Sequence, residues 1–119
     1  MKDFKKLKVW EKGVELSVQV YELVNSLPDH ERYGMSSQMT RCAISIPANV
    51  AEGSSRDSTK EYKRYLEIAL GSSFELETFL IILLRMNSFE KSPIDALIEL
   101  NREEQKMLSG LIRKLKSEL

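Results

Sequence analysis

Apolar residues recur every three or four positions along most of this 119-residue chain, which is the spacing of one face of an α-helix. Only five glycines and three prolines interrupt the pattern, at or near the points where it stops or bends. The sequence therefore predicts an all-α fold with helices over about residues 8–26, 36–54, 58–87 and 93–117.

Local signals mark the ends of these helices. Pro28 ends the first, because proline lacks a backbone donor and disfavours helical geometry in the residue before it. Asp57 or Ser58 can cap the third helix, and Ser58, with a glutamate three residues later, is typical of a capping box. Ser92 is expected to cap the fourth helix. Pro47 lies inside the second helix and is expected to kink or split it.

The connections between the predicted helices are only a few residues long. Short connections make consecutive helices antiparallel, so we expect one domain, residues 1–119, folded as an antiparallel up-down-up-down four-helix bundle. With 42% hydrophobic and 30% charged residues, the chain is too apolar to be intrinsically disordered.

Cysteine content and hydropathy indicate the compartment. Cys42 is the only cysteine, so no intramolecular disulfide can form, and the first ten residues lack the apolar stretch of a secretory signal. The longest apolar run, residues 79–84, is about a third of the roughly 20 residues that cross a bilayer as a helix. We expect a cytoplasmic protein with no membrane partner.

The residue types of enzyme active sites are scarce. The single histidine, His30, is expected in a solvated turn, and Cys42 is expected to be a small buried hydrophobe. Zinc-ligand spacing, a Glu-x-x-His pair and a phosphate-binding glycine loop are all absent from the sequence. Glu103 and Glu104 are adjacent and point in different directions on a helix, so we assign both to solvated faces. We expect no catalytic residue, cofactor or metal.

The chain carries more apolar surface than a small bundle needs. The first helix has two apolar stripes, and the third is apolar on nearly every side over residues 76–86. This surplus predicts a subunit interface, or alternatively a thick core that the fourth helix crosses obliquely. The two stripes are Leu7, Trp10, Val14, Tyr21 and Val24, and Val9, Leu16, Val20, Leu23 and Leu27.

A polar stripe runs along the second helix and faces polar residues of the third. If the turn between these helices is centred at residues 56–57, Arg41 lies beside Ser72 and within one turn of Glu75, which predicts an Arg41–Glu75 ion pair. The stripe and the residues facing it are Arg41, Ser45, Asn49, Glu52, Ser72 and Glu75.

The third helix carries small residues opposite this stripe. Ala69, Gly71 and Ser72 are expected to let the two helices approach closely. Because ion-pair networks also serve packing specificity, we expect the stripe to be structural rather than catalytic.

The same region resembles a known family. The matching runs are Ser37–Arg41, Ser45–Gly53 (Ser-Ile-Pro-Ala-Asn-Val-Ala-Glu-Gly), Tyr65–Ala69, Gly71–Ser72 and Glu75–Glu77, with Phe4–Trp10 at the start. They resemble the four-helix bundle proteins encoded in bacterial 23S rRNA intervening sequences. The resemblance implies a bundle that assembles as a homopentamer. It also implies a relation to the accessory variability proteins of diversity-generating retroelements, pentamers that bind nucleic acid and a reverse transcriptase.

The charges sum to zero but are unevenly placed. In the predicted bundle, both termini and the turn after the second helix share one end, where twelve basic and six acidic residues give a net charge of +6. The opposite end and the middle each carry −3. The basic residues assigned to a nucleic-acid site are Lys5, Lys6, Lys8, Lys12, Arg56, Lys60, Lys63, Arg64, Arg113 and Lys114.

Two functions follow as hypotheses. In a ring of parallel subunits, the basic ends would join and hold a phosphate backbone, of RNA or DNA, without reading its sequence. The alternative for these lysines is a solubilising, partly disordered terminus. The second hypothesis is a scaffold that recruits a protein partner through apolar or acidic surfaces, without nucleic acid.

Overall fold

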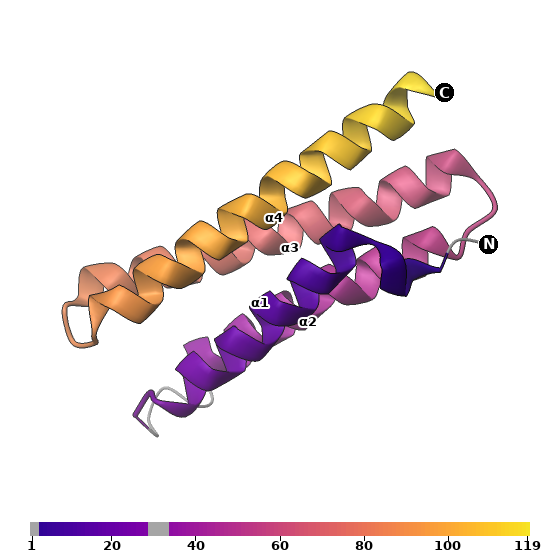
Figure 1. The fold of residues 1–119 in the computed structure, drawn as a ribbon. Coiled ribbons are helices and arrows are strands. Elements are labelled where there is room, and N and C mark those ends of the chain that lie inside the picture. The colour runs from indigo at the N-terminus through magenta and orange to yellow at the C-terminus, as the bar shows by residue number, and fades with distance from the viewer. Residues whose placement is uncertain (1–2, 29–33) are drawn as a thin grey trace.

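The computed structural model describes residues 3–28 and 34–119, and within these ranges it contains helices and no strand (Figure 1). The all-α prediction is therefore confirmed for the described residues. His30 and the charged residues Lys2, Asp29, Glu31 and Arg32, which entered the predictions, lie outside them. The elements are η1 (Phe4–Lys6), a short 3-10 helix, and the α-helices α1 (Lys8–Asn25), α2 (Met35–Ser54), α3 (Thr59–Met86) and α4 (Lys91–Ser117).

The four helices form an elongated bundle of 47 × 21 × 20 Å. Each helix packs against its neighbours in the sequence, α4 also packs against α1, and a single buried cluster lies between them. The N-terminal segment, the α2–α3 connection and the end of α4 lie at the same end of the bundle (Figure 1).

The core takes up one of the two apolar stripes of α1 fully and the other in part, since Leu7, Trp10 and Val24 pack against it. Val9, Leu16, Val20 and Leu23 are buried, whereas Tyr21 of the other stripe is 46% exposed. On α3, likewise, Leu80 and Leu83 are buried and Ile82 and Met86 are exposed. Part of the apolar surplus therefore lies on the surface of the chain.

Helix α2 continues through Pro47, so of the two expected effects, a kink or a split, the split is wrong. Proline cannot donate to the carbonyl of Ala43, but the Ser17 hydroxyl of α1 donates to that carbonyl at 3.0 Å. The same hydroxyl lies 2.9 Å from the carbonyl of Gly13, which shares the proton. The backbone acceptor that proline leaves in α2 is therefore satisfied by the neighbouring helix.

Helix α1 lies close to both α2 and α4 at Gly13. A Cβ at this position would lie 2.9 Å from Oε2 of Glu104 and 3.3 Å from Cβ of Pro47. Real Cβ atoms essentially never come this close to another atom, so the glycine allows three helices to meet at one level.

The helix ends follow their local signals with one exception. The Ser58 side chain accepts from the backbone N–H of Glu61 at 3.0 Å, which confirms the cap of α3. Asn87 ends α3 in the left-handed conformation, with φ of 58°. The predicted cap at Ser92 is wrong, because α4 already begins at Lys91 with Glu90 at the N-cap position. Proline is tolerated just inside this start, where backbone N–H groups have no partner in the helix.

Candidate nucleic-acid interface

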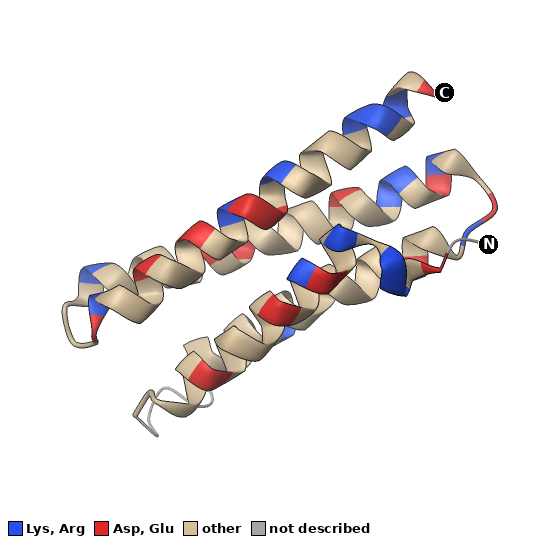
Figure 2. Ribbon diagram, viewed as in Figure 1, with Lys and Arg blue, Asp and Glu red and all other residues tan. Residues whose placement is uncertain are grey.

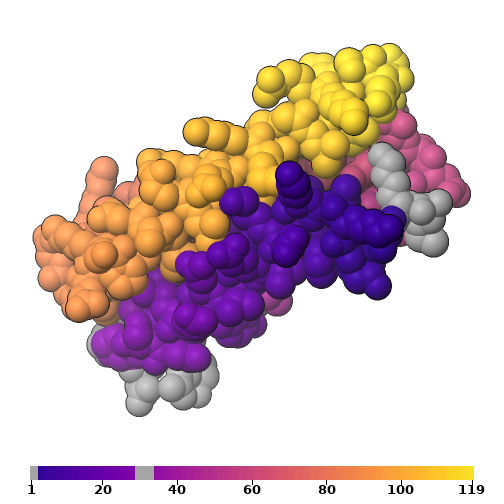
Figure 3. All heavy atoms as spheres, viewed as in Figure 1, coloured from indigo at the N-terminus to yellow at the C-terminus, as the bar shows by residue number. Residues whose placement is uncertain are grey.

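The ten basic residues predicted to bind nucleic acid come from η1, α1, the α2–α3 connection, α3 and α4, and they lie toward one end of the bundle (Figure 2). The start of α1, the start of α3 and the end of α4 lie toward this end (Figure 3). We call this set the basic end: Lys5, Lys6, Lys8, Lys12, Arg56, Lys60, Lys63, Arg64, Arg113 and Lys114.

The N-terminal lysines are held in place by η1. The Asp3 carboxylate accepts from the backbone N–H of Lys5 at 3.1 Å and caps this short helix. The Phe4 ring packs edge-on against Trp10, with ring centroids 5.2 Å apart. Lys5 and Lys6 are therefore placed beside the start of α1.

Most cations of the basic end have no carboxylate partner among the described residues. Lys12, Arg56 and Lys63 form ion pairs at 3.0, 2.9 and 3.1 Å. Of these, Arg56 also lies 5.1 Å from the ring centroid of Tyr65. The other seven form no ion pair with any residue that the structure describes, and they can meet phosphate oxygens: Lys5, Lys6, Lys8, Lys60, Arg64, Arg113 and Lys114.

The middle of the polar stripe joins α2 to α3. The hydroxyls of Ser45 and Ser72 are 2.8 Å apart, and Asn49 Nδ2 donates to the carbonyl and hydroxyl of Ser45 at 2.8 and 2.9 Å. These groups satisfy one another, so this part of the stripe is structural. At its end, Glu52 forms an ion pair with Arg56.

The predicted Arg41–Glu75 ion pair is wrong. Both side chains are exposed, and no ion pair joins them. A helix has 3.6 residues per turn, so Arg41 is rotated around α2 relative to Ser45, and Glu75 is rotated around α3 relative to Ser72. Both residues therefore lie to one side of the Ser45–Ser72 contact. At such an exposed margin an ion pair contributes only about 0–1 kcal/mol and costs side-chain entropy.

The predicted helix register is also wrong by about one turn. Ser72 lies opposite Ser45 rather than Arg41, because α3 begins beyond the end of α2 and the hairpin is not symmetric about its connection (Figure 1). Gly71 does not mediate the approach, since a Cβ there would meet nothing within 4 Å. The close approach occurs at Gly53, where a Cβ would lie 2.7 Å from Cβ of Tyr65.

A shallow groove of about 460 Å³ between α3 and α4 extends the positive surface from the basic end toward the middle of the bundle. Phe74, 53% exposed, lies in this groove. We call it the α3–α4 groove; its lining residues are Phe74, Glu77, Arg102, Gln105, Lys106, Ser109 and Arg113.

The sequence prediction missed the α3–α4 groove. It placed Arg102 and Lys106 in a region of net negative charge and gave Phe74 no role. Helical spacing could have indicated that Phe74 is exposed. The buried residues Ser73 and Leu76 mark the core stripe of α3, and Phe74 lies between them in the sequence but outside that stripe on the helix.

The core holds a carboxyl group that the sequence prediction assigned to solvent. Glu104 is 0% exposed, and neither of its oxygens has a hydrogen-bond partner among the described residues. Burial raises its pKa from 4.5 to about 8, partly offset by the charge of Lys12. Glu104 is thus mostly neutral at pH 7, and the middle of the bundle is less negative than the sequence count indicates.

The side chain of Cys42 is buried, as expected for a small hydrophobe. Its Sγ donates to the carbonyl of Met39 at 3.3 Å. Burial, reinforced by the charge of Glu75, raises the pKa of its thiol to about 12. The residue is therefore a thiol at neutral pH rather than a reactive thiolate.

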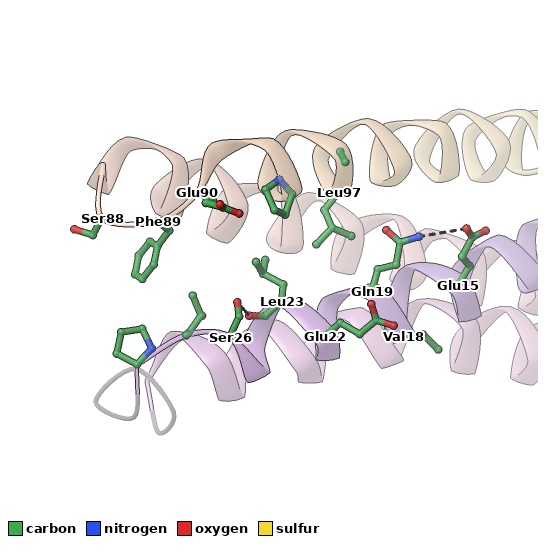
Figure 4. Close-up of a pocket in the computed structure, with 14 residues that line it drawn as sticks. Glu15, Val18, Gln19, Glu22, Leu23, Ser26, Ser88, Phe89, Glu90 and Leu97 are labelled. Atoms are coloured by element: carbon green, nitrogen blue, oxygen red, sulfur yellow. Dashed lines mark hydrogen bonds between the residues drawn. The ribbon is translucent and has the colours of Figure 1, made fainter.

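A second groove, of about 890 Å³, lies between the C-terminal half of α1 and the start of α4 (Figure 4). Leu23, Phe89 and Leu97 lie between the two helices there. The carboxylates lining it belong to Glu15, Glu22 and Glu90, and no lysine or arginine is among its lining residues in the described part of the chain. We call this surface the acidic groove.

Metal ligands do not cluster in the part of the chain that the structure describes. Nowhere in residues 3–28 and 34–119 do three His, Cys, Asp or Glu side chains come together as ligands for a metal ion. No helix in these ranges combines the length and the apolar character needed to cross a bilayer.

Comparisons with known proteins agree with the fold. The family model for the 23S rRNA-intervening sequence protein matches residues 5–110. A crystal structure from Bacteroides thetaiotaomicron, of a protein of unknown function from the S23 ribosomal protein family, is similar to this chain. It has 27% sequence identity, a TM-score of 0.82, and coverage of 88% of this chain and 95% of that one. No curated protein matches.

Proposed function

This chain belongs to the 23S rRNA-intervening sequence protein family, and we propose that it is a non-enzymatic, cytoplasmic, homo-oligomeric bundle that binds RNA or DNA through its basic end. The observation that carries the proposal is the group of seven cations at that end without an ion pair to any described residue. Such cations release condensed counterions when they neutralise phosphates, which drives binding that does not depend on sequence.

The exposed apolar residues support assembly. Ile68, Ile82 and Met86 lie on one side of α3 by helical spacing, and each is more than two-fifths exposed, as is Ile44 on α2. Exposed apolar residues on one side of a helix are typical of a surface that packs against another copy of the chain. Together with the family resemblance, it supports an up-down-up-down bundle that forms a homopentamer, whose parallel subunits would gather five basic ends into one ring.

A salt titration of nucleic-acid binding tests the proposal. Neutralising Lys60 and Arg64 with glutamine removes two free cations. We expect weaker binding and a log–log salt slope shallower by about 0.7–0.9 for each phosphate that the variant no longer neutralises. The matched control neutralises Arg85 and Lys91 at the opposite end, which should leave both affinity and slope unchanged. Equal effects of the two pairs, or no binding at low salt, would contradict the proposal.

The acidic groove favours a second candidate function, a scaffold that recruits a basic amphipathic helix from a protein partner. Its carboxylates and leucines match lysines and an apolar stripe on such a helix. A synthetic helical peptide with leucines on one face and lysines on the other should bind, and reversing Glu22 and Glu90 to lysine should weaken that binding. A glutamate version of the peptide is the control, and equal binding of both peptides would exclude this function.

A further inference from the structure

We propose that Phe74 is a stacking platform for an unpaired base of a single-stranded nucleic acid whose phosphates contact Lys106 and Arg113. This inference rests on the proposed nucleic-acid function and names the form of nucleic acid bound and the residue that contacts a base. Its evidence is the composition of the α3–α4 groove.

Phe74 is placed to receive a planar ligand. Its side chain is 53% exposed although phenylalanine is usually buried, and it lies in a groove rather than on a flat surface. Stacking on an aromatic ring is open to every base, because each base has a π face. The site therefore fits a base without selecting among the four.

The cations of the groove lie along one face of α4. Arg102, Lys106 and Arg113 are separated by four and seven residues, which aligns them over about 16 Å of helix. Lys106 and Arg113 form no ion pair with a described residue. They leave two positive charges beside the exposed ring for the phosphates on either side of a stacked base.

The one carboxylate of the groove is already occupied. Glu77 accepts from the Arg102 guanidinium at 3.0 Å and from the Gln105 amide at 2.9 Å. Its negative charge is partly offset by Arg102, which also lies 3.7 Å from Glu99. The lining of the groove has three cations, Arg102, Lys106 and Arg113, against the carboxylate of Glu77, so it continues the positive surface to Arg113 of the basic end.

The position of the ring decides between single and double strands. In a duplex, base faces are covered by their stacked neighbours, and an enzyme or binding protein must expose a base before it can contact that face. A phenylalanine on a helix surface, within a shallow groove, reaches only a base that is already unpaired. Phe74 therefore favours single-stranded over duplex nucleic acid.

The test compares two ligands of equal charge: a single-stranded 12-mer of thymidylate and an abasic 12-mer in which tetrahydrofuran replaces every nucleoside. Fluorescence anisotropy with the full-length protein should give about 5- to 100-fold tighter binding of the thymidylate 12-mer. Phe74→Ala should remove most of this preference and leave the affinity for the abasic 12-mer unchanged. Tyr21→Ala, an exposed aromatic position of α1 outside the groove, is the matched control and should keep the preference.

The outcomes separate this inference from the proposed function. Failure of both 12-mers to bind at low salt would contradict the proposed function itself. Equal binding of both, or a preference that survives Phe74→Ala, would contradict only the stacking site. A lower assembly mass of Phe74→Ala in light scattering would also overturn the inference, since the ring would then be a contact between copies of the chain. Lys106→Gln should weaken both 12-mers by the same factor.

Discussion

Replacing Glu104 with glutamine should stabilise the protein at neutral and alkaline pH. The carboxyl group is fully buried and has no hydrogen-bond partner among the described residues, so its charged form is disfavoured in the folded state. Its pKa is 4.5 when unperturbed and about 8 when folded, so between these values the folded state binds more protons than the unfolded state. Stability from this group is therefore complete below pH 4.5 and is lost as the pH rises toward 8.

The magnitude follows from the difference between the two pKa values. Each pH unit in this interval costs about 1.4 kcal/mol of unfolding free energy, which amounts to about 3 kcal/mol at pH 7 and about 5 kcal/mol above pH 8. Glutamine has nearly the same shape and no charge, so Glu104→Gln should remove this slope. A change of about 3 kcal/mol is a large part of the 5–15 kcal/mol that stabilises a typical domain.

The assay is urea unfolding followed by circular dichroism at pH 5, 6, 7 and 8, at one protein concentration. The free-energy difference between Glu104→Gln and the natural protein should grow with pH. Glu103→Gln is the control, because Glu103 is an exposed neighbour whose ion pair with Lys12 is worth at most about 1 kcal/mol. A constant difference across this pH range would refute the assignment of Glu104 as a neutral buried acid.

Three further predictions concern packing and reactivity. Ser17→Ala should lower the unfolding free energy by about 1–3 kcal/mol in urea titrations, because a buried carbonyl of α2 loses its donor; an unchanged midpoint would contradict this role. Gly53→Ala should destabilise the protein by about 1–3 kcal/mol through overpacking. Gly110→Ala, with open space around the new Cβ, should stabilise the protein by about 0.5–1 kcal/mol. Calorimetry should therefore show the melting temperatures of the two variants shifted in opposite directions from that of the natural protein. Cys42 should react with a thiol reagent only after unfolding, and rapid labelling of the folded protein would contradict its burial.

The helices could be predicted from the sequence because their signals are local. Pro28 follows the first helix, Ser58 caps the third, and apolar spacing marks the buried faces between such ends. The continuity of α2 could not be predicted from Pro47 alone. It depends on a hydroxyl donated by Ser17, which is 30 residues away in the sequence and adjacent only in the folded bundle.

The burial of Glu104 could have been inferred from spacing. Glu104 continues the core stripe of α4 between Leu97 and Leu108. The sequence prediction nevertheless placed it on a solvated face, because glutamate is a charged residue. The Arg41–Glu75 error is different in kind. Whether two exposed side chains pair depends on small free-energy differences at a helix margin, which residue spacing does not resolve.

Cross-linking of a bound nucleic acid tests the central claim most directly. A single-stranded RNA containing 4-thiouridine, irradiated in complex with the full-length protein and mapped by mass spectrometry, reports which surface it contacts. We predict cross-links within residues 5–12, 56–64 and 102–114, which contain the basic end and the α4 side of the α3–α4 groove. Cross-links confined to the opposite end, around Arg85 and Lys91, would contradict the account.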